Sequence, residues 1–206
     1  MKIIGLTGGI GSGKSTVSRV LEVLGIPVYE ADTESKRLVD TSPYIREQLV
    51  DAFGSQLYKN GELDKAMLAS LIFGNKENLQ YVNSVIHPAV FDDFRHWTER
   101  QMQSRVVVIE SAILFDSGFD KTVDVTVNVS APLEIRIRRV GERDKVSRKS
   151  IEERINSQMP EEERNRLSDY TIINDEIHAL LPQVGNLLNY LFRFTEYENF
   201  LINFVP

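Results

Sequence analysis

The feature that most constrains this chain is a glycine-rich turn close to its start. Residues 8–15 read Gly-Gly-Ile-Gly-Ser-Gly-Lys-Ser and match the pattern G-x-x-x-x-G-K-[ST]. An apolar run, Lys2 to Thr7, precedes the turn, and apolar residues at helical spacing follow it from Lys14 to Leu24, where Gly25 is a stop signal. An ordinary glycine-rich turn would explain the letters alone. The strand and helix on either side favour a phosphate-binding turn.

The residue types explain how such a turn holds a polyanion. Glycines let successive backbone N–H groups turn inward around phosphate oxygens, and the helix start adds unpaired N–H groups and the positive end of its dipole. Lys14 would reach the β- and γ-phosphates of ATP, and the Ser15 hydroxyl would ligate Mg²⁺. The sequence therefore predicts ATP and Mg²⁺ as cofactors of phosphoryl transfer to a small molecule. The expected nucleotide-binding residues of the turn are Gly9, Gly11, Ser12, Gly13, Lys14, Ser15 and Thr16.

Apolar runs alternate with helical patterns along the chain, which predicts an α/β fold with a five-stranded parallel sheet flanked by helices. The candidate strands are Lys2–Thr7, Ile26–Glu30, Arg105–Glu110, Val123–Ser130 and Tyr170–Asn174. Only helical patterning lies between the second and third strands, with helix starts at Ser42-Pro43, Leu63-Asp64 and Pro88. We expect a core made of residues 1–32, 105–131 and 168–191, a helical substrate insert over 33–104, and a lid over 132–167. Residues 192–206 are aromatic-rich and carry no readable role.

Composition excludes several classes of protein. The chain of 206 residues has no cysteine, so thiol catalysis, disulfides and thiolate metal sites are excluded. Its net charge of −6 argues against a general nucleic-acid binder, which needs an excess of lysine and arginine. The first strand is not followed by a cleavage site, and no aliphatic run approaches the roughly 20 residues that span a bilayer. We expect a cytoplasmic protein with no nucleic-acid or membrane partner, as a monomer or small homo-oligomer.

Two acidic residues at strand ends are candidates for the chemistry. The carboxyl ends of parallel strands form the ligand crevice of an open sheet, so Asp32, just after the second strand, could accept a proton from an acceptor hydroxyl. Asp32 could equally cap the helix that follows. Glu110 closes the third strand, where a carboxylate often holds Mg²⁺, or it could be a structural acid.

A basic cluster follows the fourth strand, in contrast to the acidic balance of the whole chain. Such a cluster could close over a triphosphate as a lid, or it could be a solvated helix face paired with Glu142 and Asp144. We favour the lid, because the cations follow a strand of the predicted nucleotide core. The cluster comprises Arg136, Arg138, Arg139, Arg143, Lys145, Arg148 and Lys149.

With these residues in hand, the chain resembles the dephospho-CoA kinase family over nearly its whole length. The likeness rests on the turn Thr7–Thr16, on Val28–Asp32, and on two stretches similar to the family's substrate-side motifs, Asn60–Asp64 and Asn83–Pro88. Arg143-Asp144, Gln158 and the segment from Ser168 to Asn174 resemble its lid and post-lid elements.

The resemblance implies a P-loop kinase fold with a helical CoA-binding insert and a lid. It also implies transfer from ATP·Mg²⁺ to the ribose 3′-hydroxyl of dephospho-CoA, the last step of coenzyme A synthesis. By this analogy Asp32 is the base, Lys14 and Arg139 stabilise the transferring group, Arg143 contacts the nucleotide, and His87 contacts the acceptor. Taken alone, a lone histidine such as His87 is more often a capping or packing residue.

The sequence departs from the family pattern at several positions. Glu30 stands where aspartate is usual, Arg136 where glutamine is expected, and Ser111–Asp116 lacks the proline and the glutamate of the corresponding family segment. These departures leave the turn, Asp32 and the arginines Arg139 and Arg143 untouched.

Two other functions remain open from the sequence. A nucleoside or nucleotide kinase of the same architecture would show the same turn, base and lid. A nucleotide-dependent switch would need a guanine reader, and Asn75–Asn78 breaks that pattern at its last residue. Asp51–Gly54 matches the spelling of a second switch motif but follows a helical pattern instead of a strand.

Overall fold

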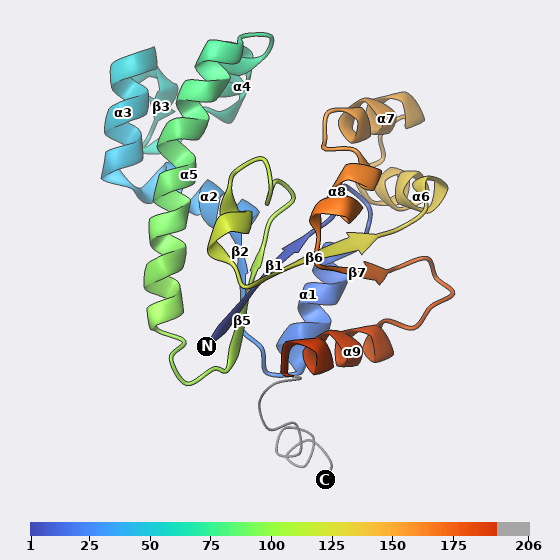
Figure 1. Cartoon of the computed structure of the whole chain (residues 1–206). Coiled ribbons are helices and arrows are strands. Elements are labelled where there is room, and N and C mark those ends of the chain that lie inside the picture. The colour runs from blue at the N-terminus through green and yellow to red at the C-terminus, as the bar shows by residue number, and fades with distance from the viewer. Residues whose placement is uncertain (193–206) are drawn as a thin grey trace. The chain divides into compact units, whose positions relative to one another are not determined.

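A five-stranded parallel sheet forms the centre of the fold in the computed structural model, which describes residues 1–192 (Figure 1). The strand order is β2-β5-β1-β6-β7, so the strand that leads into the glycine-rich turn is central. The strands are β1 (Lys2–Thr7), β2 (Val28–Glu30), β5 (Val106–Glu110), β6 (Val125–Ser130) and β7 (Tyr170–Ile173). The predicted α/β fold is confirmed.

The register of the sheet places the strand ends beside one another. Leu6 of β1 lies opposite Glu110 of β5, and Thr7 lies opposite Asn128 of β6. Because all these strands run in the same direction, their carboxyl ends, the glycine-rich turn and the residues after β7 meet at one edge of the sheet.

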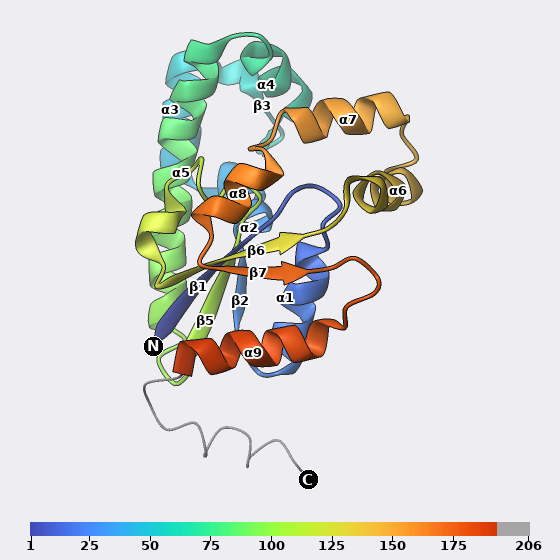
Figure 2. The same ribbon diagram turned by 45° about the vertical axis from the view of Figure 1, so that its right-hand side comes forward.

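Helices cover both faces of the sheet (Figure 2). Helices α1 (Lys14–Val23) and α9 (Leu180–Phe192) pack on one face, where alternate strand residues such as Ile4, Leu6 and Val108 meet Val17 of α1 and Leu187 of α9. Helix α1 ends where Gly25 takes a left-handed φ of 75° and returns its N–H to Glu22, which confirms the predicted stop. The short helix α8 (Glu161–Leu167) lies on the opposite face against β6.

Three helices make up most of the segment between β6 and β7. It contains α6 (Leu133–Asp144), α7 (Arg148–Asn156) and α8, and a 3₁₀ turn, η2 (Phe119–Thr122), precedes β6. An apolar cluster of Ile137, Val140 and Ile151 joins α6 to α7. Compact unit 1 consists of Met1–Val28 together with the described residues from Gln103 onward, and it includes this segment.

Compact unit 2, Tyr29–Met102, is mostly helical. Its helices are α2 (Ala31–Thr41), α3 (Pro43–Phe53), α4 (Lys65–Ile72) and α5 (Lys76–Glu99), with a 3₁₀ turn η1 (Ser55–Leu57). Ser42 caps α3 and Asp64 caps α4 through their side chains, as the sequence predicts. The unit overlaps the stretch 33–104 that the sequence predicts as an insert.

Two features of unit 2 differ from the sequence-based prediction. Pro88 does not open a helix but lies inside α5, a helix of 24 residues, so the predicted helix start there is wrong. The stretch is also not purely helical, since β3 (Tyr58–Lys59) and β4 (Glu62–Leu63) form an antiparallel pair. Strands of two residues are too short to show an alternating pattern in the sequence.

Helix α9 includes Phe192, the first residue of the stretch to which the sequence assigns no role. The remainder of that stretch, residues 193–206, lies outside the described residues. Among residues 1–192, no helix is both long enough and apolar enough to cross a membrane.

Tyr29 anchors the beginning of unit 2. Its ring packs against Phe94 and Trp97 of α5, with ring centroids 5.2 and 5.5 Å away. Its hydroxyl donates a 2.7 Å hydrogen bond to Asp93, which also accepts one from Arg37 at 2.8 Å. Burial acts to raise the pKa of Asp93, but the hydrogen bonds from Tyr29 and Arg37 outweigh it and lower the pKa.

We expect Tyr29→Phe to destabilise the protein by about 1–2 kcal/mol, because it removes a hydrogen bond to a partly buried carboxylate and keeps the ring packing. Thermal unfolding followed by circular dichroism would then show a Tm about 2–8 °C lower. Tyr44→Phe, at an exposed position of α3, is the matched control and should leave Tm unchanged. Equal Tm values for the two variants would contradict the anchoring role of the Tyr29 hydroxyl.

Candidate active site

The glycine-rich turn joins the central strand to the helix that covers it. β1 ends at Thr7, and α1 begins at Lys14 after Gly13, which takes a left-handed φ of 95° as the N-cap residue. Within the turn, Ser12 donates its backbone N–H to the carbonyl of Gly9 at 3.0 Å. The turn therefore presents its amides, with the amino end of a helix, at the carboxyl edge of the sheet.

Close approaches around the turn require glycine at two positions. A Cβ on Gly13 would lie 2.0 Å from the side-chain nitrogen of Asn174, and a Cβ on Gly9 would lie 2.3 Å from a guanidinium nitrogen of Arg136. These distances are far below van der Waals contact. The side chains of Asn174 and Arg136 therefore pack directly against the main chain of the turn, which only glycine at these two positions permits.

Lys14 and Glu110 lie together at the base of the turn. The ammonium of Lys14 donates to the carbonyl of Gly8 at 2.9 Å and lies 3.9 Å from a carboxylate oxygen of Glu110. Glu110 is buried at the end of β5, one strand away from the turn. Ser15 and Thr16 are exposed in the first turn of α1. Both residues are thus open to solvent, as ligation of a metal or a phosphate requires.

Arg139 approaches the turn from α6. Its guanidinium lies 3.5 Å from the carbonyl of Gly11 and 3.4 Å from that of Ser12. It also lies 3.4 Å from the side-chain oxygen of Asn174 and 3.3 Å from Glu176. This arginine is therefore beside the turn, with partners on the segment that follows β7.

Arg143, one turn further along α6, has a different neighbour. Its guanidinium donates to the adjacent Asp144 at 2.7 Å, and this hydrogen bond raises the pKa of Arg143. Its predicted contact with nucleotide stays a prediction.

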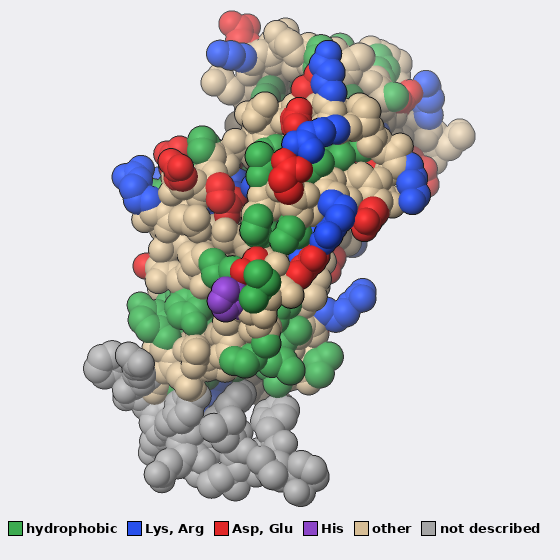
Figure 3. Space-filling model, turned by 90° about the vertical axis from the view of Figure 1, so that its right-hand side faces the viewer, with side chains coloured by type: hydrophobic (Ala, Val, Ile, Leu, Met, Phe, Trp, Pro, Cys, Tyr) green, Lys and Arg blue, Asp and Glu red, His purple; other side chains and the backbone are tan. Residues whose placement is uncertain are grey.

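Other members of the basic cluster are paired with acids. Arg138 pairs with Glu176, and the exposed Arg148 pairs with Glu134 and Glu152 on α6 and α7. On the face shown in Figure 3, which is the side of α6 and α7 in Figure 1, basic and acidic side chains lie next to one another. The cluster is thus a mixed-charge surface, with Arg139 and Arg136 turned toward the glycine-rich turn.

Three residues at the turn were not among the predicted site residues. Asn174, just after β7, donates to the carbonyl of Ser12 at 2.8 Å. Gln158 accepts the backbone N–H of Ile10 at 2.8 Å, and Arg136 donates to the carbonyl of Ile10 at 2.9 Å. The likeness of Gln158 and Asn174 to family motifs was the available signal for those two. The signal for Arg136 was its place in the basic cluster, since the family pattern has glutamine there.

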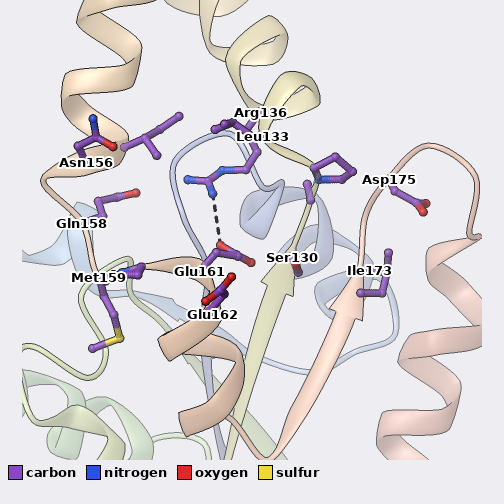
Figure 4. Close-up of a pocket in the computed structure, with 14 residues that line it drawn as sticks. Ser130, Leu133, Arg136, Asn156, Gln158, Met159, Glu161, Glu162, Ile173 and Asp175 are labelled. Carbon is purple, nitrogen blue, oxygen red and sulfur yellow. Dashed lines mark hydrogen bonds and ion pairs between the residues drawn. The ribbon is translucent and has the colours of Figure 1, made fainter.

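A cavity of about 640 Å³ adjoins Arg136 in unit 1 (Figure 4). It is bounded by the ends of β6 and β7, the start of α6 and the connection between α7 and α8. In Figure 4 the guanidinium of Arg136 points toward Glu161, and Gln158 and Met159 come from the wall beside it.

Asp32 and His87 belong to unit 2. The N-cap residue of α2 is Glu30, so the alternative that Asp32 caps this helix is wrong. Asp32 lies in the first helical turn with an exposed side chain. His87 is half-buried inside α5, and burial lowers its pKa, so the ring is neutral at physiological pH. The proton-accepting role of Asp32 and the substrate contact of His87 stay predictions.

Among residues 1–192, no three histidine, aspartate or glutamate side chains gather to hold a metal ion by themselves. The oxygen ligands predicted for Mg²⁺, Ser15 and Glu110, are of the chemical type that this ion prefers. Mg²⁺ at nucleotide sites is commonly held by few protein groups together with water and phosphate oxygens.

Comparison with known proteins assigns the chain to a family. The sequence profile described as "Dephospho-CoA kinase" matches residues 2–179. The dephospho-CoA kinase of Bacteroides fragilis strain YCH46 is 44% identical over 194 residues, which cover 94% of this chain and 95% of the relative. That of Porphyromonas gingivalis is also 44% identical, over 91% of this chain and 93% of the relative.

Solved structures share the fold of this chain. A Thermus thermophilus protein superposes with a TM-score of 0.80 at 34% identity, covering 95% of this chain and 98% of the other. The dephospho-CoA kinase of Campylobacter jejuni has a TM-score of 0.65 at 22% identity over 93% of this chain and 96% of the other, and shares the fold. The chain belongs to the dephospho-CoA kinase family.

Proposed function

We propose that this chain transfers the terminal phosphoryl group of ATP to the ribose 3′-hydroxyl of dephospho-CoA, giving coenzyme A and ADP. One observation carries the proposal: in a member of this family, the glycine-rich turn at residues 8–15 joins β1 to α1 at the carboxyl edge of the sheet, with Lys14 and Arg139 beside it. This arrangement suits a kinase, because phosphoryl transfer depends mainly on positioning and on charge stabilisation.

In this proposal the residues of the turn hold the phosphates of ATP. Gly9, Gly11, Ser12, Gly13, Lys14 and Ser15 contact phosphate oxygens, with further contacts from Thr16 and Arg143. Lys14 and Arg139 stabilise the negative charge that develops on the transferring group. Lys14 can reach a phosphate by exchanging its present contact with the carbonyl of Gly8, 2.9 Å away.

Ser15 and Glu110 are the residues that would hold Mg²⁺ on the protein side. When bound, this ion supplies positive charge that neutralises the phosphate oxygens. The supporting observation is chemical: Ser15 offers an exposed hydroxyl, and Glu110 ends the strand next to β1 and lies 3.9 Å from Lys14.

On the acceptor side, Asp32 takes the proton of the attacking hydroxyl, and His87 contributes to acceptor binding. Exposure of the Asp32 carboxylate and its freedom from a capping role support this assignment. Neutral His87 could donate or accept one hydrogen bond. We assign the insert 33–104 to the acceptor and the segment 132–167 to a lid. We place the reaction in the cytoplasm, with the chain as a monomer or small homo-oligomer.

The acceptor is the part of this proposal that the fold leaves open. A shikimate kinase of Acinetobacter baumannii shares the fold with a TM-score of 0.52 at 18% identity, so different small molecules are phosphorylated on this scaffold. We expect release of ADP with dephospho-CoA and little with nucleosides or nucleotides. Mass analysis of the product should locate the new phosphate on the ribose 3′-oxygen. Comparable turnover of a nucleotide would favour the nucleotide-kinase alternative.

Asp32→Asn keeps the shape of the side chain and removes the proton acceptor. We expect turnover with dephospho-CoA to fall about 10²–10⁴-fold, while the Kd for ATP stays nearly unchanged. Asp51→Asn, at an exposed position of α3, is the matched control and should retain wild-type turnover. If Asp32→Asn turned over at the wild-type rate, Asp32 would not be the base.

Lys14→Ala removes the cation at the turn. We expect weaker ATP binding and at least about a hundredfold slower transfer, because the same charge serves both the bound nucleotide and the transition state. Isothermal titration with ATP and single-turnover kinetics measure the two effects separately. Lys121→Ala, an exposed lysine of unit 1, controls for loss of a positive charge. Wild-type binding and transfer in Lys14→Ala would contradict the assignment of the turn.

A further inference from the structure

Ile10 is the residue of the glycine-rich turn that is held most completely by the segment between β6 and β7. Its side chain packs against the apolar cluster of α6 and α7. Its N–H is donated to Gln158, and its carbonyl accepts from the Nε of Arg136, at 2.8 and 2.9 Å. Both backbone groups of one peptide position are therefore fixed by side chains more than 120 positions away in the sequence.

Arg136 is itself fixed by buried charges. Its side chain is 5% exposed, and its guanidinium lies 3.3 Å from Oε2 of Glu161. The same carboxylate oxygen accepts from Arg164, whose side chain is 2% exposed, at 2.7 Å. The other oxygen of Glu161 accepts from the Asn128 amide at 3.2 Å. Glu161 therefore joins two buried arginines to the central part of the sheet.

Arg164 also holds the residue next to Gln158. Its guanidinium donates to the carbonyl of Met159. The contacts of Ile10 with Arg136 and with Gln158 are therefore both supported by Arg164, in the first case through Glu161 and in the second through Met159. Figure 4 shows Arg136 and Glu161 joined, with Gln158 and Met159 on the adjacent wall of the cavity. The three charged side chains, Arg136, Glu161 and Arg164, form what we term the charged triad, in which both arginines are buried and Glu161 is 24% exposed.

A charged triad with two buried arginines is costly for stability. Removing charges from water carries a penalty that mutual attraction only partly offsets, and well-packed apolar residues often serve stability as well or better. The triad instead fixes an orientation. A planar guanidinium with fixed partners holds the carbonyl of Ile10 in one position. It also leaves one net positive charge beside the turn, because two guanidinium groups share one carboxylate.

We propose that Arg136 is a positioning residue of the phosphate-binding turn, which it holds through the carbonyl of Ile10 and with its own place set by Glu161 and Arg164. The proposal rests on the proposed function in that ATP is the ligand of the turn. A turn held in one shape binds phosphates without first being ordered, so loss of Arg136 weakens nucleotide binding. The rate at saturating ATP changes little, because Lys14 and Arg139 remain.

The alternative is that Arg136 contacts the phosphates directly through its charge. The two roles differ in what substitutions at Arg136 and Glu161 do. Arg136→Gln retains an N–H donor for Ile10 and loses the charge, whereas Arg136→Met loses both. Glu161→Gln retains the charge of Arg136 and weakens its fixation.

The experiment measures the Kd for ATP by isothermal titration, together with KM for ATP, kcat and Tm, in all three variants. We expect Kd and KM to rise about tenfold in Arg136→Met and about threefold in Arg136→Gln, with kcat within about twofold of wild type. Glu161→Gln should also weaken ATP binding, by about threefold or more. Arg19→Gln, at an exposed position of α1 outside the proposed lid, is the matched control and should bind ATP as the wild type does.

Three results would overturn the inference. Equal losses in Arg136→Gln and Arg136→Met, with unchanged or tighter binding in Glu161→Gln, would show a direct charge contact. A lower Tm with wild-type Kd and KM in the variants at both positions would show a purely structural role. Failure of the wild-type protein to bind ATP would overturn the proposed function and this inference with it. If Arg136→Met does not fold, the comparison of Arg136→Gln with Glu161→Gln decides between the two roles.

Discussion

The site of unit 1 depends on how closely the main chain between β1 and α1 is approached by its neighbours. A guanidinium nitrogen of Arg136 and the amide of Asn174 occupy the space where Cβ atoms of Gly9 and Gly13 would be. Arg136 and Asn174 donate to the carbonyls of Ile10 and Ser12, and these hydrogen bonds fix the direction of both carbonyls. Because each peptide unit is planar, fixing its carbonyl also fixes the direction of the N–H on its far side. The glycines thus do more than permit a tight turn: they let side chains from distant segments determine which way the amides point.

The parts of this fold that could be predicted depend on residues that are neighbours in the sequence. The turn at residues 8–15, the strand before it and the helix after it follow from pattern and spacing, and the five strands were located to within about two residues. The caps Ser42 and Asp64 could also be predicted, because a capping residue and the helical turn that it caps are neighbours in the sequence. Local chemistry decides these features, and tertiary contacts do not override it.

The parts that could not be predicted depend on contacts across the chain. Pro88 reads as a helix start, yet it lies inside α5. Nothing local reveals that a helix 24 residues long continues through a proline. The contacts of Arg136 and Gln158 with Ile10 join residues separated by 126 and 148 positions, and only the folded chain brings them together. In a sequence, Arg136 is simply one member of a basic cluster.

Burial divides that cluster into two kinds of cation. Arg139 and its partner Glu176 are partly exposed, and such a pair exchanges partners at small cost because water replaces what is lost. A guanidinium in this setting can turn from a carboxylate to a phosphate when a polyanion arrives. Arg136 is buried, so breaking its pair with Glu161 would leave the guanidinium charge away from water. Arg136 and Arg139, three positions apart on α6, therefore suit different roles. The partly exposed Arg139 can change partners when a ligand binds, whereas the buried Arg136 holds the turn in place.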